Sequence, residues 1–159
     1  MTEQQNPPQP TGVPLSVNLQ YLKDLSFESP RAPQVFVSEG PQSQVGVNVR
    51  VDGRGVGENT YEITLHLEVA ATAGDAQVFL LEMDYAGIFT VPQLIPEVLG
   101  PLLMIEAPRM LFPFARQIVS NTVAAGGFPP LLINPIDFAD LYRRQLAAQV
   151  QAQGAPAQA

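Results

Sequence analysis

The chain has 159 residues, enough for one domain, and its lack of cysteine excludes disulfides and thiolate chemistry. Only 14% of its residues are charged and 46% are hydrophobic, so much of the surface must be neutral or apolar unless other subunits cover it. The formal net charge of -7 disfavours nucleic acid and anionic membrane surfaces as partners and favours basic segments of other proteins.

The two ends of the chain predict flexible tails. Residues 1–14 are rich in Gln and Pro, and residues 152–159 contain only Ala, Gln, Gly and Pro, so neither segment can bury enough apolar area to offset the entropy of ordering. We therefore expect one domain over residues 15–151. The N-terminus is not typical of a signal peptide, and the apolar stretch 87–108 is too often interrupted by Pro and Glu to suggest a membrane span.

Between the tails, four segments alternate apolar and polar residues with the period of two that is typical of β-strands. These segments cover about residues 17–28, 45–51, 61–69 and 78–85. Short connections with Gly follow the second and third segments, which favours an antiparallel meander. The connection over residues 29–44 contains several prolines and predicts a long crossover loop.

Such a sheet has one apolar and one polar face. The apolar face is predicted to hold Val17, Leu19, Tyr21, Leu25, Phe27, Val45, Val47, Val49, Val51, Tyr61, Ile63, Leu65, Leu67, Val69, Phe79, Leu81, Met83 and Tyr85. It is either plain core or, where helices leave it open, a ligand groove. The polar face is predicted to hold Asp24, Glu28, Glu62, Glu68, Glu82 and Asp84, with Val78 and Leu80 among them. It is either a solvated face or a flat anionic platform for a basic partner.

Helical patterns follow the strands. From Pro108 to Ala125, apolar residues form two adjacent helical rows, Met110, Phe114 and Ile118 beside Leu111, Ala115, Val119 and Val123. Because proline is tolerated only in or near the first turn, this helix is expected to start close to Pro113, and Gly126-Gly127 should end it. Asn134 and Pro135 predict the cap and first residue of a last helix. The fold class is therefore α+β, a four-stranded antiparallel sheet with two C-terminal helices packed on one face.

No reactive constellation is visible in the sequence. His66 is the only histidine and alternates onto the polar face, where we expect an exposed surface residue, so a metal site or a Ser-His-Asp arrangement is disfavoured. The glycines of residues 53–57 lack the Lys-Ser/Thr ending of a phosphate loop and predict a hairpin turn instead. We therefore expect no catalytic residue, no metal, no cofactor and no enzyme activity.

Several segments resemble the SecB family of protein-export chaperones. They are Tyr21–Glu28, Glu82–Phe89, Pro108–Arg116 and Gly127–Leu131, and the ending Asn134–Tyr142 also agrees. The resemblance extends from about residue 17 to residue 146, and an LFPFAR-type helix segment followed by a GGFPPL-type turn is specific to this family.

The resemblance implies an ATP-independent chaperone that holds unfolded secretory preproteins in the bacterial cytoplasm and delivers them to the SecA ATPase. It implies a homotetramer, a dimer of dimers with the long helix at the interface, and neither nucleic-acid binding nor direct membrane insertion. A client groove between the sheet, the crossover loop and the C-terminal helix would draw on Val45, Val47, Val49, Phe79, Leu81 and Met83. Binding of the SecA motor would use Asp24, Glu28, Leu80 and Glu82, which all belong to the predicted polar face.

Two alternatives remain open at this stage. A SecB-like chaperone of a toxin–antitoxin system would share the fold, and a small-ligand-binding α+β module would share the helices over a sheet. The short C-terminal tail without an added module and the presence of all four motor-binding positions favour export.

Overall fold

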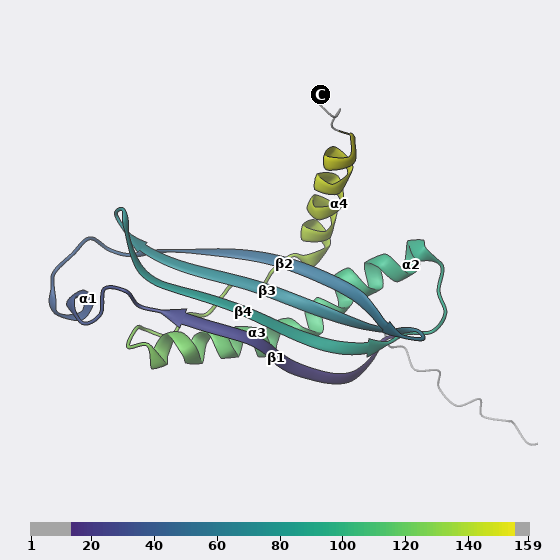
Figure 1. The fold of residues 1–159 in the computed structure, drawn as a ribbon, viewed down its shortest axis with the longest axis horizontal. Coiled ribbons are helices and arrows are strands. Elements are labelled where there is room, and N and C mark those ends of the chain that lie inside the picture. The colour runs from purple at the N-terminus through teal and green to yellow at the C-terminus, as the bar shows by residue number, and fades with distance from the viewer. Residues whose placement is uncertain (1–13, 155–159) are drawn as a thin grey trace, which may run out of the picture.

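The computed structural model describes residues 14–154, in which four long strands precede a helical C-terminal part (Figure 1). The strands are β1 (Ser16–Glu28), β2 (Gln44–Gly57), β3 (Thr60–Ala73) and β4 (Ala76–Thr90). They form one sheet in the order β1-β4-β3-β2, and all neighbouring strands are antiparallel. The predicted α+β class and four-stranded antiparallel sheet are confirmed.

The connections between strands follow the local turn chemistry. The turn between β3 and β4 places Gly74 at a φ of 61°, where a residue without a Cβ is favoured. Strands β1 and β2 lie at opposite edges of the sheet, so the connection between them must cross from one edge to the other. It contains the short helix α1 (Gln34–Val37) and passes around one end of the sheet (Figure 1).

Irregularities in strand pairing move three residues away from their predicted faces. The register of β1 against β4 shifts between Val17 and Leu19 and again between Leu22 and Asp24. Because a one-residue shift reverses the side-chain direction, Leu19 and Tyr21 lie on the polar face, and their assignment to the apolar face was wrong. Val78, expected on the polar face, lies at a register shift between β3 and β4 and is buried.

The long helix begins earlier than the sequence predicts. Helix α2 (Pro96–Pro101) continues through a π-helical turn, η1 (Leu102–Glu106), into α3 (Ala107–Ala125). The expected start close to Pro113 is wrong, because this proline lies inside α3. Pro113 is exposed, so the carbonyl group that loses its helical partner there can bond to water. The predicted end at Gly126-Gly127 is confirmed, and Gly127 has a φ of 91°.

Helix α3 covers the apolar face of β3 and β4 with one of its two predicted rows. Leu111, Ala115, Val119 and Val123 are buried against the sheet. The adjacent row is less covered, and Phe114 keeps 54% of its surface exposed. By length and composition alone, the helix Pro96–Ala125 could cross a membrane. Its packing on the sheet accounts for the apolar composition of the buried row.

Helix α4 (Phe138–Gly154) starts later than predicted and points away from the sheet (Figure 1). Its cap is Asp137, whose Oδ1 accepts a hydrogen bond of 3.0 Å from the backbone N–H of Asp140. The predicted start at Asn134 and Pro135 is therefore wrong, because a carboxylate closer to the helix takes the capping role. The helix includes residues 152–154 of the expected C-terminal tail, and residues 1–13 and 155–159 of the two tails lie outside the described part.

Candidate functional site: a charged sheet face and an apolar edge groove

The face of the sheet opposite α3 brings together the four predicted motor-binding residues. Glu28 lies opposite Leu80 across the β1–β4 pair, and Glu82 lies two residues further along β4, opposite Ser26. Asp24 is on the same face of β1, opposite Asp84. We call Asp24, Glu28, Leu80 and Glu82 the acidic platform. Asp24, Glu28 and Glu82 are exposed and Leu80 is half-buried, so a partner can reach all four.

The platform has a net negative field because its carboxylates are not neutralised by neighbours. Glu82 lies directly opposite Glu68 of β3, an unfavourable pairing of like charges. Within residues 14–154, no Lys, Arg or His forms an ion pair with Asp24, Glu28, Glu68 or Glu82. Retaining unpaired acids at adjacent strand positions costs stability, which is typical of a surface kept for a cationic partner.

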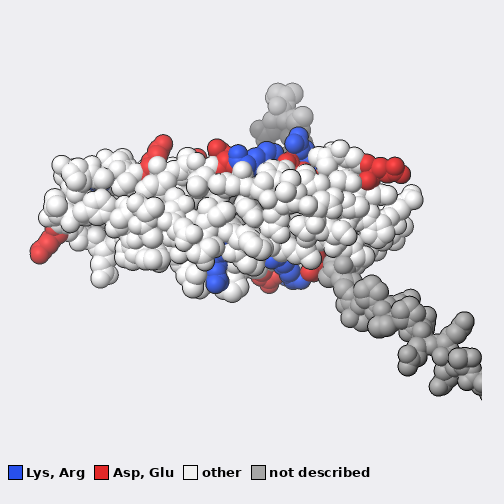
Figure 2. Space-filling view, turned by 90° about the horizontal axis from the view of Figure 1, so that it is seen from below, with Lys and Arg blue, Asp and Glu red and all other residues white. Residues whose placement is uncertain are grey.

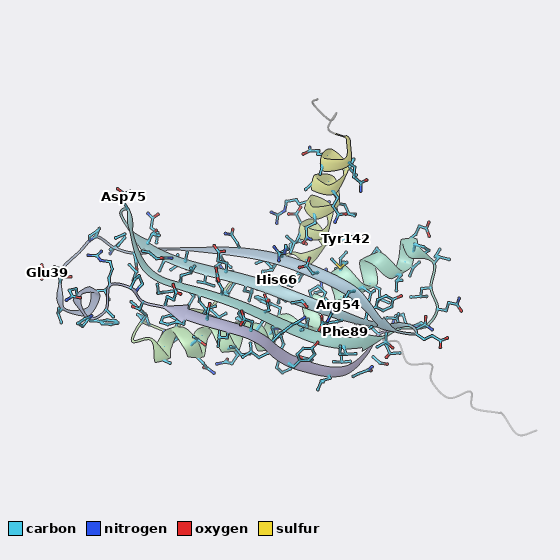
Figure 3. All side chains as sticks on the ribbon, viewed as in Figure 1. Glu39, Arg54, His66, Asp75, Phe89 and Tyr142 are labelled. Carbon is cyan, nitrogen blue, oxygen red and sulfur yellow. The ribbon has the colours of Figure 1, made fainter. Side chains whose placement is uncertain are left out.

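His66 marks the middle of this face (Figure 3). Its Nε2 lies 2.6 Å from Asp52 Oδ2 of β2, and its Nδ1 contacts Asp84 Oδ1 of β4. The side chain thereby connects the two strands that flank β3. Asp24, Glu68, Glu82 and Asp84 surround a shallow cavity of about 320 Å³ beside His66. The expected exposed surface histidine is therefore a half-buried residue held between two carboxylates.

Two basic residues of the face, Lys23 and Arg54, gather around Glu62, whereas Arg50 pairs with Asp52 and lines the cavity beside His66. Glu62 Oε1 accepts bonds of 2.9 Å from Lys23 Nζ and 2.9 Å from Arg54 Nε, and its Oε2 accepts one from the Tyr21 hydroxyl. Arg54 lies toward the end of the sheet where α2 begins, and Asp75 lies in the turn at the opposite end (Figure 3). Glu62 is 5% exposed, so this cluster is an internal connection and not part of the platform.

The cluster shifts the ionisation of two of its members. The hydrogen bond from Tyr21, with further bonds from Lys23 and Arg54, lowers the pKa of Glu62 to about 2 even though burial opposes this. Burial, and then the neighbouring Glu62 carboxylate, raises the pKa of Tyr21 to about 12. Glu62 is therefore held ionised and Tyr21 neutral across the neutral pH range.

The six predicted groove residues divide into two groups. Phe79, Leu81 and Met83 are buried, at 4%, 0% and 2% exposure, beneath α3 and the loop that follows it. Val45 and Val47 are exposed and Val49 is half-buried at the edge strand β2. As an open surface, the predicted groove is thus limited to the three valines, because the helices cover the centre of the apolar face.

These valines form one wall of a cavity of about 550 Å³, which we call the edge groove. The connection between α3 and α4 and the first turns of α4 supply the opposite wall, through Leu131, Leu132, Ile133, Asn134, Ile136, Leu141 and Arg144. Leu132 is 63% exposed and available to a ligand. The C-terminal helix was expected to border the groove, but the sequence analysis missed the part of the wall formed by residues 131–136, although the apolar run 131–133 directly after two prolines was a visible signal.

An aromatic cluster connects buried Phe79 with the surface. The ring centroid of Phe79 lies 5.6 Å from that of Phe27 in β1 and 5.0 Å from that of Phe128, which follows α3. Phe128 in turn lies 5.1 Å from Phe36 of the crossover loop, and Phe36 is 49% exposed. Gly126 and Gly127 leave room for Phe27 and Phe36, since a Cβ at either glycine would press on these rings. The cluster therefore offers a second apolar surface beside the crossover loop, and its members Phe27, Phe36 and Phe128 were not among the predicted groove residues.

The flank of the molecule on the side of β1 and α3 has an uncharged central band. Figure 2 shows the molecule from below the view of Figure 1, where β1 and α3 lie lowest. Charged side chains follow two margins of this side, and an uncharged band lies between them. The described residues contain no group of three or more His, Cys, Asp or Glu placed to hold a metal ion. The arrangement can bind apolar segments and cations, and residues 14–154 contain no evident group arranged for catalysis.

Comparisons with known proteins agree on one family. The family model described as "Preprotein translocase subunit SecB" matches residues 5–149. The chain is 48% identical to the protein-export protein SecB of Rhodospirillum centenum over 87% of this chain and 83% of that protein. It is 46% identical to the protein of the same name from Rhodopseudomonas palustris, over 92% of this chain and 94% of that protein.

A solved structure has a similar fold. It is the SecB-like chaperone of Mycobacterium tuberculosis in complex with a peptide from an antitoxin, with a TM-score of 0.59 and 15% sequence identity. The similarity covers 77% of this chain and 90% of that one. At this identity the likeness describes the fold alone.

Proposed function

The chain belongs to the SecB family of protein-export chaperones, and we propose that two separate surfaces divide the work of this function. The edge groove and aromatic cluster hold unfolded secretory preproteins in the cytoplasm without ATP. The acidic platform binds the SecA ATPase, to which the client is passed. The observation that carries the proposal is that unneutralised acids and open apolar surface lie on opposite faces of one sheet.

Client binding rests on apolar burial in the edge groove. A holdase that binds the unfolded but not the native chain shifts the folding equilibrium by mass action. Burial supplies roughly 25 cal/mol per Å², part of which is offset by ordering of the client. Val45, Val47 and Val49 contact the client directly, and Phe79 supports the aromatic cluster. Leu81 and Met83 stabilise the core beneath α3, because both are buried.

SecA binding rests on the charge of the acidic platform. Its carboxylates lack internal partners, so a basic surface of the motor gains interactions without first breaking ion pairs. Leu80 supplies an apolar contact among the acids. Such binding should weaken as salt is added, because the screening length falls to about 8 Å at physiological ionic strength.

Self-assembly rests on the partly covered row of α3 and on the uncharged flank. Phe114 is 54% exposed on a helix whose opposite row is core. A homotetramer, as a dimer of dimers, would bury Phe114 and its neighbours. The complex is expected to work without a cofactor, without catalysis, without nucleic acid and without insertion into the membrane.

Export is favoured over the two alternatives. The relatives that share 48% and 46% identity with this chain are named protein-export proteins, whereas the antitoxin-peptide complex is 15% identical. A small-ligand module would need an enclosed cavity, and the edge groove is open along β2 with Val45 and Val47 exposed.

The test is a light-scattering measurement of molar mass, for the protein alone and after addition of a denatured, slow-folding precursor protein. The expected result is a mass near four subunits that rises by one client without nucleotide. Addition of SecA should then form a complex whose affinity falls with salt. A monomer or dimer that does not bind the unfolded precursor would contradict the proposal.

A further inference from the structure

Lys23 is the cation that lies nearest to the acidic platform along the chain. It is the only lysine of the sequence, and it directly precedes Asp24. In the pairing of β1 with β4, Leu22 lies opposite Tyr85 and Asp24 lies opposite Asp84, so Lys23 is an extra residue without a partner in β4. Such an extra residue is typical of a β-bulge, which redirects the side chains around it.

The side chain of Lys23 nevertheless bonds to a residue two strands away. Strand β4 lies between β1 and β3, and Lys23 Nζ reaches over it to Glu62 Oε1 at 2.9 Å. The Tyr21 hydroxyl crosses the same strand to Glu62 Oε2. Ala86 is the residue of β4 opposite Tyr21, and it is fully buried. A methyl group at this position leaves room for the two longer side chains to cross.

Glu62 holds more than one cation of this face. Its Oε1 also accepts a bond of 2.9 Å from Arg54 Nε, so one buried carboxylate binds both Lys23 and Arg54. These two side chains keep 42% and 68% of their surface exposed, and long exposed side chains are free to turn when no partner holds them. The remaining arginine of the face, Arg50, pairs with Asp52.

The space around Glu62 leads directly to the platform. Lys23, Arg54, Glu62 and Asp84 line one cavity of about 410 Å³. Asp84 also lines the adjoining cavity beside His66, together with Asp24 of the platform. A lysine released from Glu62 therefore meets Asp84 within the same cavity and Asp24 directly beside it. Because these two carboxylates face each other as like charges, they would attract a free cation.

We propose that Glu62 sequesters Lys23 and thereby keeps Asp24 available to a basic partner. Glu62 is a positioning residue, because it acts through Lys23 and is itself too buried to touch a partner. Arg54 is held in the same way, but on β2, away from the β1 edge. The inference rests on the proposed motor binding and states what keeps that surface charged. A basic partner then meets carboxylates without first displacing an internal cation.

The first test is a rescue experiment on SecA affinity. Glu62→Gln keeps the side-chain volume but cannot hold a cation, so SecA binding should weaken about five- to tenfold at low salt, while client binding stays unchanged. Adding Lys23→Gln to this variant should return the affinity to within about twofold of the wild type. Lys23→Gln alone should change it by less than about twofold, because the lysine is already sequestered.

A matched control separates position from total charge. Arg143→Gln removes one positive charge from an exposed side chain of α4, the helix that points away from the sheet (Figure 1). Combined with Glu62→Gln, it should leave SecA binding weak. Equal rescue by Lys23→Gln and Arg143→Gln would show that net charge governs the affinity and would overturn the inference. A loss that Lys23→Gln does not rescue would overturn it too, since Glu62 would then act only by supporting the fold.

The second test follows Lys23 directly and needs no partner. Because the chain has one lysine, isotope-labelled lysine gives a single side-chain ammonium signal in an NMR spectrum. In the wild type this signal should not move on Asp84→Asn, and in Glu62→Gln it should. A wild-type signal that moves on Asp84→Asn would place Lys23 on the platform and overturn the inference. This arm holds even if Glu62→Gln fails to fold.

A basic probe distinguishes failure of the inference from failure of the proposed function. A short oligolysine peptide takes the place of SecA in the same titrations and should show the same loss and the same rescue. If the peptide shows this pattern and SecA binds no form of the protein, the motor-binding function fails and the inference stands. If SecA binds the wild type and Glu62→Gln equally, the function stands and the inference is overturned. If neither binds the wild type, both fail.

Discussion

The two faces of this sheet are made by neighbouring residues and yet differ in what covers them. Leu81 and Glu82 are adjacent in β4, but Leu81 is fully buried beneath the helical layer and Glu82 is exposed on the acidic platform. The long helix α3 lies on the apolar face and not on the polar face (Figure 1). The apolar face is open only near the β2 edge and the aromatic cluster. Core and partner surface can therefore be tested by substitutions one residue apart.

The largest expected effect is on stability, at Leu81. Leu81→Ala should lower the free energy of unfolding by about 2–5 kcal/mol, because it removes fully buried methyl groups from a packed layer. Glu82→Ala is the adjacent control and should stay within about 0.5 kcal/mol. Chemical denaturation measures both. A stability change at Leu81 as small as that at Glu82 would mean that the helices do not seal the centre of the apolar face.

The next effect is on motor binding. Charge reversal of the platform, with Asp24, Glu28 and Glu82 all changed to Lys, should weaken SecA binding by about a hundredfold at low salt, with less loss at high salt. Client binding should be unchanged. Titration calorimetry or fluorescence anisotropy with each partner measures both affinities.

The matched control for that variant reverses three acids away from the platform. Glu39, Glu58 and Glu97 are exposed on the crossover loop, the β2–β3 turn and α2. Their replacement by Lys changes the net charge equally and should reduce SecA binding only slightly. Equal losses in the two triple variants would show that total charge, and not the platform, governs binding.

A smaller effect is expected at the edge groove. Val47→Asp places a charge on the exposed groove wall and should weaken client binding by about tenfold with little change in the free energy of unfolding. Val56→Asp adds the same charge at a similarly exposed valine of β2 that does not line the groove, and should leave client binding intact. Competition with a labelled unfolded precursor distinguishes the two variants, and similar losses would mean that any charge on β2, and not one in the groove, weakens client binding.

The last expected effect is a dependence of stability on pH, which arises at Glu62. Its pKa is lowered to about 2 in the folded chain, so its stabilising contribution is present above the ordinary value of 4.5 and is lost as the pH falls toward 2. Tyr21, whose pKa is raised to about 12, contributes stability that is lost as the pH rises from 10 toward 12.

Glu62→Gln tests this expectation, because it keeps the volume of the side chain but removes the charge that titrates. Thermal unfolding from pH 2 to pH 6 should show a shallower acid limb for the variant than for the wild type. Identical acid limbs would mean that other carboxylates control the acid denaturation.

The sequence by itself determined the strands, their two faces and the family. Alternation is a local property with a period of two, so Asp24, Glu28, Leu80 and Glu82 could be placed on one face without knowledge of distant segments. The assignment by alternation failed where pairing of β1 with β4 introduced register shifts, which place the side chains of Leu19 and Tyr21 on the polar face. The helix starts were misplaced for a similar reason, because the early turns before Pro113 and the cap at Asp137 depend on packing and side-chain geometry.

Only the tertiary structure decided which part of the apolar face is open. Whether Val47 or Leu81 is exposed depends on the path of segments far along the chain, namely α3 and residues 131–141. These contacts have large sequence separations and no local pattern encodes them. The hydrogen bonds of Gln145 with the backbone of Val51, 94 positions earlier, are of the same kind. From the sequence alone, a polar residue on an exposed helix is expected to face solvent, and only the fold places it at a strand edge.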